Sequence, residues 1–128
     1  MLVMDGNSPE KIQNIVFGLH LPVRRLIVFA CKAKAIQFVE ELDIAEGDWS
    51  FFAADGSPLE AHFSTVPKIN HDQNTYENGV YDLRPAMSGA NLLDILVVAD
   101  CQDDASSGLV TLRDVEQFVI DQALEQKK

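Results

Sequence analysis

Six apolar residues follow one another without alternation from Leu26 to Cys31. A run of this kind is typical of a strand that is covered on both faces, so we expect it to form the central strand of a sheet. Apolar positions at helical spacing follow directly and predict a helix over Lys32 to Leu42. The strand–helix–strand unit from Arg24 to Ala54 should cross over right-handed, which places its two strands parallel.

The most regular alternation surrounds the dipeptide Asp55-Gly56. On both sides of it, residues suited to a core face alternate with residues suited to an outer face. Asp-Gly is a preferred turn between two antiparallel strands. The pattern therefore predicts a hairpin. Because every second residue of a strand points to the same face, five side chains should share the core face: Trp49, Phe51, Leu59, Ala61 and Phe63.

Helical periodicity predicts a helix at each end of the chain. Ser8-Pro9-Glu10 has the residue types of a helix start, and an apolar stripe continues to Leu19, with Gly18 and Pro22 as terminators. Near the other end, Thr111 and Asp114 resemble a capping box that opens a helix to about Gln126. That last helix has a wide apolar arc, formed by Leu112, Val115, Phe118, Val119, Ile120, Ala123 and Leu124.

The region between the hairpin and the last helix is harder to interpret. Residues 65–91 are rich in Asn, Asp, Gly and Pro and predict a long loop, which a short strand from Gly79 to Arg84 would divide. The apolar run from Leu92 to Ala99 predicts a second buried strand, and Asp100 to Gly108 an acidic turn. Together the elements predict a single α+β domain over residues 1–128. It should contain a mixed, mainly antiparallel sheet of four to five strands with helices packed on it.

Charge and cysteine content narrow the function classes. The formal net charge of −10 should repel nucleic acid and anionic membrane surfaces, whereas a basic protein or a cation is complementary to it. Two cysteines without a Cys-x-x-Cys spacing form no disulfide framework. Neither a signal sequence nor a membrane span is recognisable, so we expect a cytoplasmic protein with reduced thiols.

Three patterns are candidates for chemistry. Cys31 ends the buried run just before a helix start, where a thiol can become nucleophilic, although a buried structural thiol is the commoner role. His62, His71 and Asp72 have the residue types of a metal site, but their spacing matches no ligand pattern. No nucleophile elbow, P-loop or dinucleotide fingerprint is present, so we expect no cofactor and no catalytic residue.

The third pattern is the stretch from Asp103 to Asp114, which resembles a calcium-binding loop of EF-hand type in outline. Gly108 occupies the required sixth position of such a loop. However, Ala105 stands where the third-position oxygen belongs, and Asp114 replaces the long glutamate that closes the loop. We interpret the stretch as a polar turn between a strand and a helix, with weak calcium binding as the alternative.

These observations favour a small, acidic, non-catalytic binding protein of immunity, chaperone or accessory type that acts on a protein partner. The expected surface combines the outer hairpin face with the long loop: Glu60, His62, Asp72, Tyr76, Glu77 and Tyr81. The apolar arc of the last helix predicts a homodimer through that helix. The alternative is an enzyme or small-ligand domain. Its pocket would lie between the sheet and residues 65–91, lined by Trp49, Phe52 and Tyr81, with His62 or His71 as the polar group.

Overall fold

The computed structural model describes residues 14–39, 44, 47–65, 68–70, 75–77, 80–96 and 100–126. Its elements are, in chain order, β1 (Val16–His20), β2 (Arg25–Phe29), α2 (Lys32–Phe38), β3 (Trp49–Ala53), β4 (Pro58–Thr65), β5 (Lys68–Asn70), β6 (Thr75–Glu77), β7 (Val80–Pro85), the 3₁₀ turn η1 (Leu92–Asp94), β8 (Asp100–Asp103) and α4 (Leu112–Gln126).

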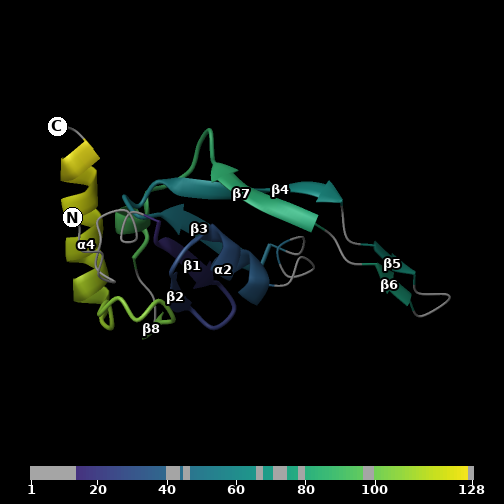
Figure 1. Cartoon of the computed structure of the whole chain (residues 1–128), viewed down its shortest axis with the longest axis horizontal. Coiled ribbons are helices and arrows are strands. Elements are labelled where there is room, and N and C mark those ends of the chain that lie inside the picture. Colours follow the sequence, from purple (N-terminus) through teal and green to yellow (C-terminus); the bar gives the residue numbers. More distant parts are fainter. Residues whose placement is uncertain are drawn as a thin grey trace, which may run out of the picture.

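Six of the strands form one mixed sheet in the order β7-β4-β3-β1-β2-β8, and β5 pairs with β6 separately. All neighbours in the large sheet are antiparallel except β2 and β8. The α+β class with a mixed sheet is therefore confirmed, but the sheet has more strands than the sequence predicted. Figure 1 shows α4 at one end of the molecule, and the β5–β6 pair beyond the far end of β4 and β7.

The prediction that the run from Leu26 is covered on both faces is confirmed. Leu26 and Val28 are fully buried in one hydrophobic cluster, whereas Ile27 and Phe29 belong to the cluster on the opposite face. The strand ends at Phe29, and its place in the sheet is next to the edge strand β8, not at the centre. Strands β2 and β3 do run parallel, because both are antiparallel to β1, which lies between them.

The helix expected up to Leu19 is wrong for its second half, because Val16–His20 is strand β1. Every residue from Ile15 to Leu19 is buried, because the strand is covered on both faces. A strand of this kind is apolar without interruption, so it also contains apolar residues at the three- and four-residue steps that indicate a helix. Gly18 also fits a sheet: a Cβ there would lie 2.8 Å from the ring of Phe29 and 3.1 Å from that of Trp49. The expected helix start at Ser8-Pro9-Glu10 lies outside the described residues.

Helix α4 covers one face of the sheet. The fully buried side chains of Val115 and Val119 pack there with Phe17 of β1 and Leu92 of η1. The predicted capping box is confirmed, since the Asp114 N–H donates to Thr111 Oγ1 (3.1 Å) and the Thr111 N–H donates to Asp114 Oδ2 (3.2 Å). Among the helices that the structure describes, none is long and apolar enough to cross a membrane.

Helix α2 packs on the other face and contacts strands that are far apart in the sheet. Phe38 lies against Phe29 of β2, with ring centroids 5.4 Å apart. The Tyr81 hydroxyl of β7 donates to the Val39 carbonyl just after the helix, at 2.9 Å. Because β1, β3 and β4 separate β2 from β7 in the strand order, the sheet must curl around α2. The predicted helix is observed to Phe38, and residues 40–43 lie outside the description.

The hairpin is confirmed, and its five predicted core residues lie in or against the cluster that faces α2. The predicted strand from Gly79 to Arg84 corresponds to β7, and the predicted loop over residues 65–91 also contains the β5–β6 pair.

The buried strand expected from Leu92 to Ala99 is wrong at its start, where Leu92–Asp94 forms the turn η1, and residues 97–99 lie outside the described residues. The Leu93 N–H donates to Asn91 Oδ1 (3.0 Å) and the Asn91 N–H donates to Asp94 Oδ2 (3.3 Å), so Asp94 caps a turn. The observed strand is β8, Asp100–Asp103, in the stretch expected to be an acidic turn. Its acidic side chains are compatible with the sheet because β8 is an edge strand, where Asp100 pairs with Arg25 at 3.1 Å.

Candidate functional site

The outer face of strands β4 and β7 is polar, and neither of the two described helices packs on it. We call it the ribbon face and define it as Glu60, His62, Ser64, Asp82 and Arg84, all of which are exposed. Alternation explains its composition, since the intervening residues Ala61, Tyr81 and Leu83 point into the cluster around α2. On the same side of the sheet α4 packs in one cluster with residues of β1, β2 and β3, so the polar character begins where the covering helix ends.

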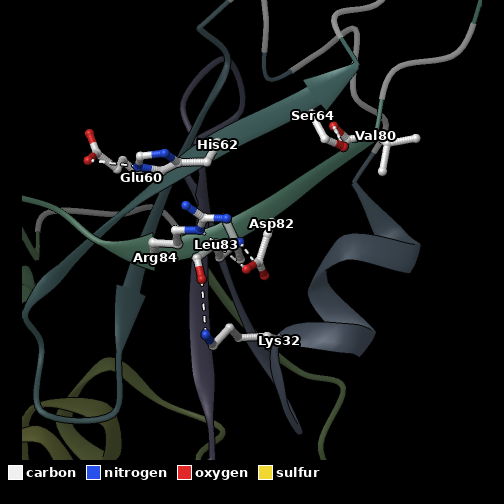
Figure 2. A network of polar contacts seen from close by, with 8 residues as sticks. All are labelled: Lys32, Glu60, His62, Ser64, Val80, Asp82, Leu83 and Arg84. Atoms are coloured by element: carbon white, nitrogen blue, oxygen red, sulfur yellow. Dashed lines mark hydrogen bonds and ion pairs between the residues drawn. The ribbon is translucent and has the colours of Figure 1, made fainter.

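The charged groups of the ribbon face alternate in sign along and across the strands. Glu60 is paired in register with Arg84, and His62 with Asp82. Figure 2 shows the contacts within each strand: His62 Nε2 lies 3.0 Å from Glu60 Oε1, and Arg84 Nε lies 3.6 Å from Asp82 Oδ2. The four side chains are between 43% and 59% exposed, so these pairs contribute little to stability. They leave carboxylate, imidazole and guanidinium groups available to a partner.

The free edge of β7 is closed at Leu83. The Leu83 N–H donates to Asp82 Oδ1 (2.8 Å), and the Leu83 carbonyl accepts from Lys32 Nζ of α2 (3.0 Å) (Figure 2). Edge strands in soluble proteins are commonly blocked in such ways, because unpaired backbone groups recruit other strands. Around Leu83 the ribbon can therefore offer its face to a partner, but not its edge.

Of the residues predicted for a binding surface, the structure brings Glu60 and His62 together. The expectation that Tyr81 is an exposed anchor is wrong: its side chain belongs to the core, and the residue is only 7% exposed. Tyr76 and Glu77 lie on β6, of which the structure describes the backbone. Asp72 and His71 lie outside the described residues.

Sequence reasoning missed Asp82 and Arg84. The signal was present, because polar residues alternate with Tyr81 and Leu83 in the short strand that was expected there. Pairing with β4 then places them beside Glu60 and His62.

A cavity of about 570 Å³ lies between β3, β4 and the segment 86–90. Trp49 and Phe52, two residues of the predicted pocket, line it. Glu60 is the one ionisable side chain among its described lining residues. Acid–base catalysis normally needs an acid and a base within reach of the same substrate, and the described lining supplies one such group.

Cys31 is half-buried at the start of α2. Two of the three histidines that could activate it are engaged elsewhere, since His20 stacks on Trp49 at 4.6 Å and His62 contacts Glu60. A nucleophilic cysteine usually needs an adjacent base, so the geometry of the described residues favours a structural thiol.

The loop from Asp103 to Asp114 is held by its own carboxylates. Asp103 Oδ1 accepts from the Ala105 N–H (3.2 Å) and from Ser107 Oγ (2.9 Å), and Asp103 Oδ2 accepts from the Gly108 N–H (2.7 Å). Asp114 Oδ2 accepts from two further backbone N–H groups. Oxygen atoms engaged in this way act as turn and cap acceptors. Among the described residues, no group of three or more His, Cys, Asp or Glu side chains is placed to hold a metal ion.

The same hydrogen bonds explain the ionisation of Asp103. Burial by itself would raise the pKa of this carboxyl, but the bonds from Ser107, Gly108 and Ala105 outweigh it and lower the pKa below its usual value. A lowered native-state pKa contributes stability above the unfolded-state value, near 4, which is lost as pH falls through the native-state value.

Replacing Asp103 with alanine should therefore destabilise the fold by about 1–2 kcal/mol near neutral pH, because three loop hydrogen bonds lose their acceptor. The loss should shrink as pH falls below about 4, where the unfolded chain takes up the proton first, and should be smallest below the lower native-state pKa of the wild-type carboxyl. Urea denaturation at several pH values measures it. Asp104→Ala is the matched control, since it removes a neighbouring carboxylate that accepts one exposed hydrogen bond, from Gln102. Equal losses in the two variants would contradict the assignment.

Comparison of the chain with protein-family models, with curated proteins and with solved structures gives no match.

Proposed function

We propose that the chain is a non-catalytic binding protein that acts on a protein partner through the ribbon face. The observation that carries the proposal is the uneven covering of the sheet. Helix α4 packs on β1, β2 and β3, whereas β4 and β7 present four charged or titratable side chains with no described element over them. A sheet face that needs no second layer, on a ribbon that extends away from α4 (Figure 1), is accessible to a large partner.

The overall charge supports a basic partner. With 20 acidic and 10 basic residues, the chain attracts cationic surfaces over distances of about a Debye length, which raises association rates. The ribbon face itself carries both signs, with Glu60 and Asp82 beside Arg84, which favours recognition of a specific charge pattern. A cytoplasmic location, where both thiols stay reduced, is part of the proposal.

The homodimer through α4 is a separate proposal about partners. The structure packs Val115, Val119 and Phe118 of the apolar arc in or against the core and leaves Ile120 (36%) and Leu124 (57%) exposed. A dimer would bury these two side chains between copies, and a patch of this size supports only weak association. Sedimentation at micromolar concentration, with Leu124→Glu as the variant, tests it.

Affinity capture from a lysate of the native organism tests the ribbon face. We expect Glu60→Lys and Arg84→Glu each to reduce capture of the specific partner at least about tenfold, because each reverses one member of the charge pattern. Glu116→Lys and Arg113→Glu are matched controls, because they make the same exchanges on exposed positions of α4. Retention of the partner by both ribbon variants would overturn the proposal.

A second candidate function is the binding of a small molecule in the cavity beside β3 and β4. Its volume of about 570 Å³ lies in the range of small-ligand sites, and aromatic and aliphatic side chains form much of its lining. A thermal-shift screen against metabolites tests this function, since a ligand of the native state raises the melting temperature.

A further inference from the structure

Strands β3 and β4 pair only next to their turn. The Ala53 N–H donates to the Ser57 carbonyl (2.8 Å), and the ladder continues through Phe52 with Pro58 and Phe51 with Leu59. An undisturbed antiparallel ladder would go on to pair Trp49 with Ala61. Within the part of the chain that the structure describes, that pairing is missing, although β3 continues to Trp49 and β4 to Thr65.

Alternation along the strands shows which backbone groups are left without a ladder partner. Every second residue of an antiparallel strand directs its N–H and C=O to the same edge. Ala53 and Phe51 bond toward β4, so Trp49 faces the same way, and Ala61 likewise faces β3, as Leu59 does. The N–H and C=O groups of Trp49 and Ala61 therefore face an opening in the sheet.

The cavity of about 570 Å³ lies at this opening. Its lining includes the consecutive residues 49–52 and 58–61. Because consecutive strand residues point to opposite faces, a cavity lined in this way follows the edges of the strands. In addition, the indole Nε1 of Trp49 is buried and has no hydrogen-bond acceptor among the described residues. Buried donors are normally paired, so this nitrogen lacks an acceptor in the described part of the chain, where the indole ring stacks on His20 and Phe51.

We propose that this opening binds a short extended segment of a partner protein, inserted as a strand between β3 and β4. A peptide backbone supplies donors and acceptors on both sides, which a compact metabolite does not. Charge complementarity favours a segment with a lysine or arginine, since Glu60 is the ionisable side chain of the described lining and the whole chain carries −10. The contrast with the outer edge of β7, which Lys32 and Asp82 close at Leu83, indicates that this internal edge is left open for an occupant. The inference rests on the proposed function, because it assumes that the partner is a protein.

Selection from a phage-displayed library of linear dodecapeptides on the full chain tests the proposal. The selected peptides should alternate apolar residues with lysine or arginine, and their synthetic forms should change the fluorescence of Trp49, the single tryptophan of the chain. N-methylation of central amides, which keeps the side chains, should weaken binding at least about tenfold, because it removes strand hydrogen bonds. Absence of enriched peptides, or equal binding after N-methylation, would overturn the proposal.

Three variants locate the site. Ser88→Phe should weaken peptide binding strongly, because Ser88 lines the cavity and a phenyl ring there occupies part of the space that the peptide needs. Gln117→Phe is the control, because it adds the same ring at an exposed position of α4 outside the cavity and the ribbon face, and it should bind as the wild type does. Glu60→Lys should weaken the binding of lysine-containing peptides. Exchange of the peptide lysine for glutamate should restore binding to this variant. Unchanged binding to Ser88→Phe would place the peptides elsewhere and contradict the proposal, as would a metabolite or a second copy of the chain that occupies the cavity instead.

The variants also separate this inference from the proposed function. Arg84 belongs to the ribbon face and does not line the cavity, whereas Ser88 lines the cavity and lies outside the ribbon face. If partner capture depends on Arg84 and not on Ser88, and no peptides are selected, the inserted strand is wrong while the ribbon face stands. If peptides bind in the cavity but partner capture does not depend on Arg84, the proposed role of the ribbon face is wrong and the inserted strand is supported.

Discussion

Replacing Gly56 with alanine is expected to reduce the free energy of unfolding by at least about 3 kcal/mol, the sum of a strained backbone and an overpacked contact. Gly56 has a φ of +84°, a conformation that side-chain-bearing residues rarely adopt. A Cβ there would lie 2.4 Å from Asn91 Oδ1 and 2.7 Å from Val119 Cγ1. Neither neighbour can move freely, since Asn91 caps η1 and Val119 is fully buried.

Gly47→Ala is the matched control. Gly47 has nearly the same φ, +83°, but no atom of the described residues lies within 4 Å of the position of its Cβ. This variant should lose only about 1–2 kcal/mol from the backbone. Urea denaturation of the two variants separates the contact from the backbone conformation. Equal losses would show that the hairpin turn does not pack against η1 and α4 as tightly as the distances indicate.

The elements that could be predicted from the sequence have local causes. The hairpin depends on a two-residue turn and an alternating pattern that its own strands contain. The capping box of α4 depends on two residues three positions apart, Thr111 and Asp114. Such signals are complete within a few residues, so no knowledge of the remaining chain is needed.

The elements that could not be predicted depend on distant partners. Strand β1 is buried on both faces because β2 and β3 flank it and a helix covers each side, and this burial removes the alternation by which a strand is recognised. The acidic sequence of strand β8 predicts a turn, and its strand conformation follows from the parallel pairing with β2. In both strands the tertiary structure decides between conformations that the local sequence leaves open.

The candidate site also contains features with local causes and features that depend on distant parts of the chain. Alternation in the hairpin was enough to place Glu60 and His62 on an outer face. The burial of Tyr81 was not predictable, because it follows from the curl of the sheet that brings β7 onto α2. The opening between β3 and β4 was equally hidden, since the sequence of the hairpin favours a continuous ladder and the point of separation depends on the surrounding structure.

Cys101 should react with alkylating reagents roughly 100-fold more slowly in the folded chain than in the unfolded chain near pH 8, because the reactive species is the thiolate. Burial raises the pKa of the Cys101 thiol to about 11, and the carboxylates of Asp103, Asp100 and Asp114 act in the same direction. The thiol also lies 3.6 Å from the Leu109 carbonyl, to which it can donate only when protonated. The Cys31→Ser variant, in which Cys101 is the only cysteine, permits the measurement by mass spectrometry.

The pH profile distinguishes a raised pKa from simple lack of access. Restricted access alone slows alkylation by the same factor at every pH and leaves the inflection near the ordinary thiol value of about 8.5. A raised pKa moves the inflection of the folded chain toward 11. It also predicts a loss of stability as pH rises from the unfolded-state value to the native-state value, because only the unfolded chain gains charge there. Cys101→Ser should remove that loss. An inflection near the ordinary value in the folded chain would mean that the acidic end of β8 does not hold its thiol in the neutral form.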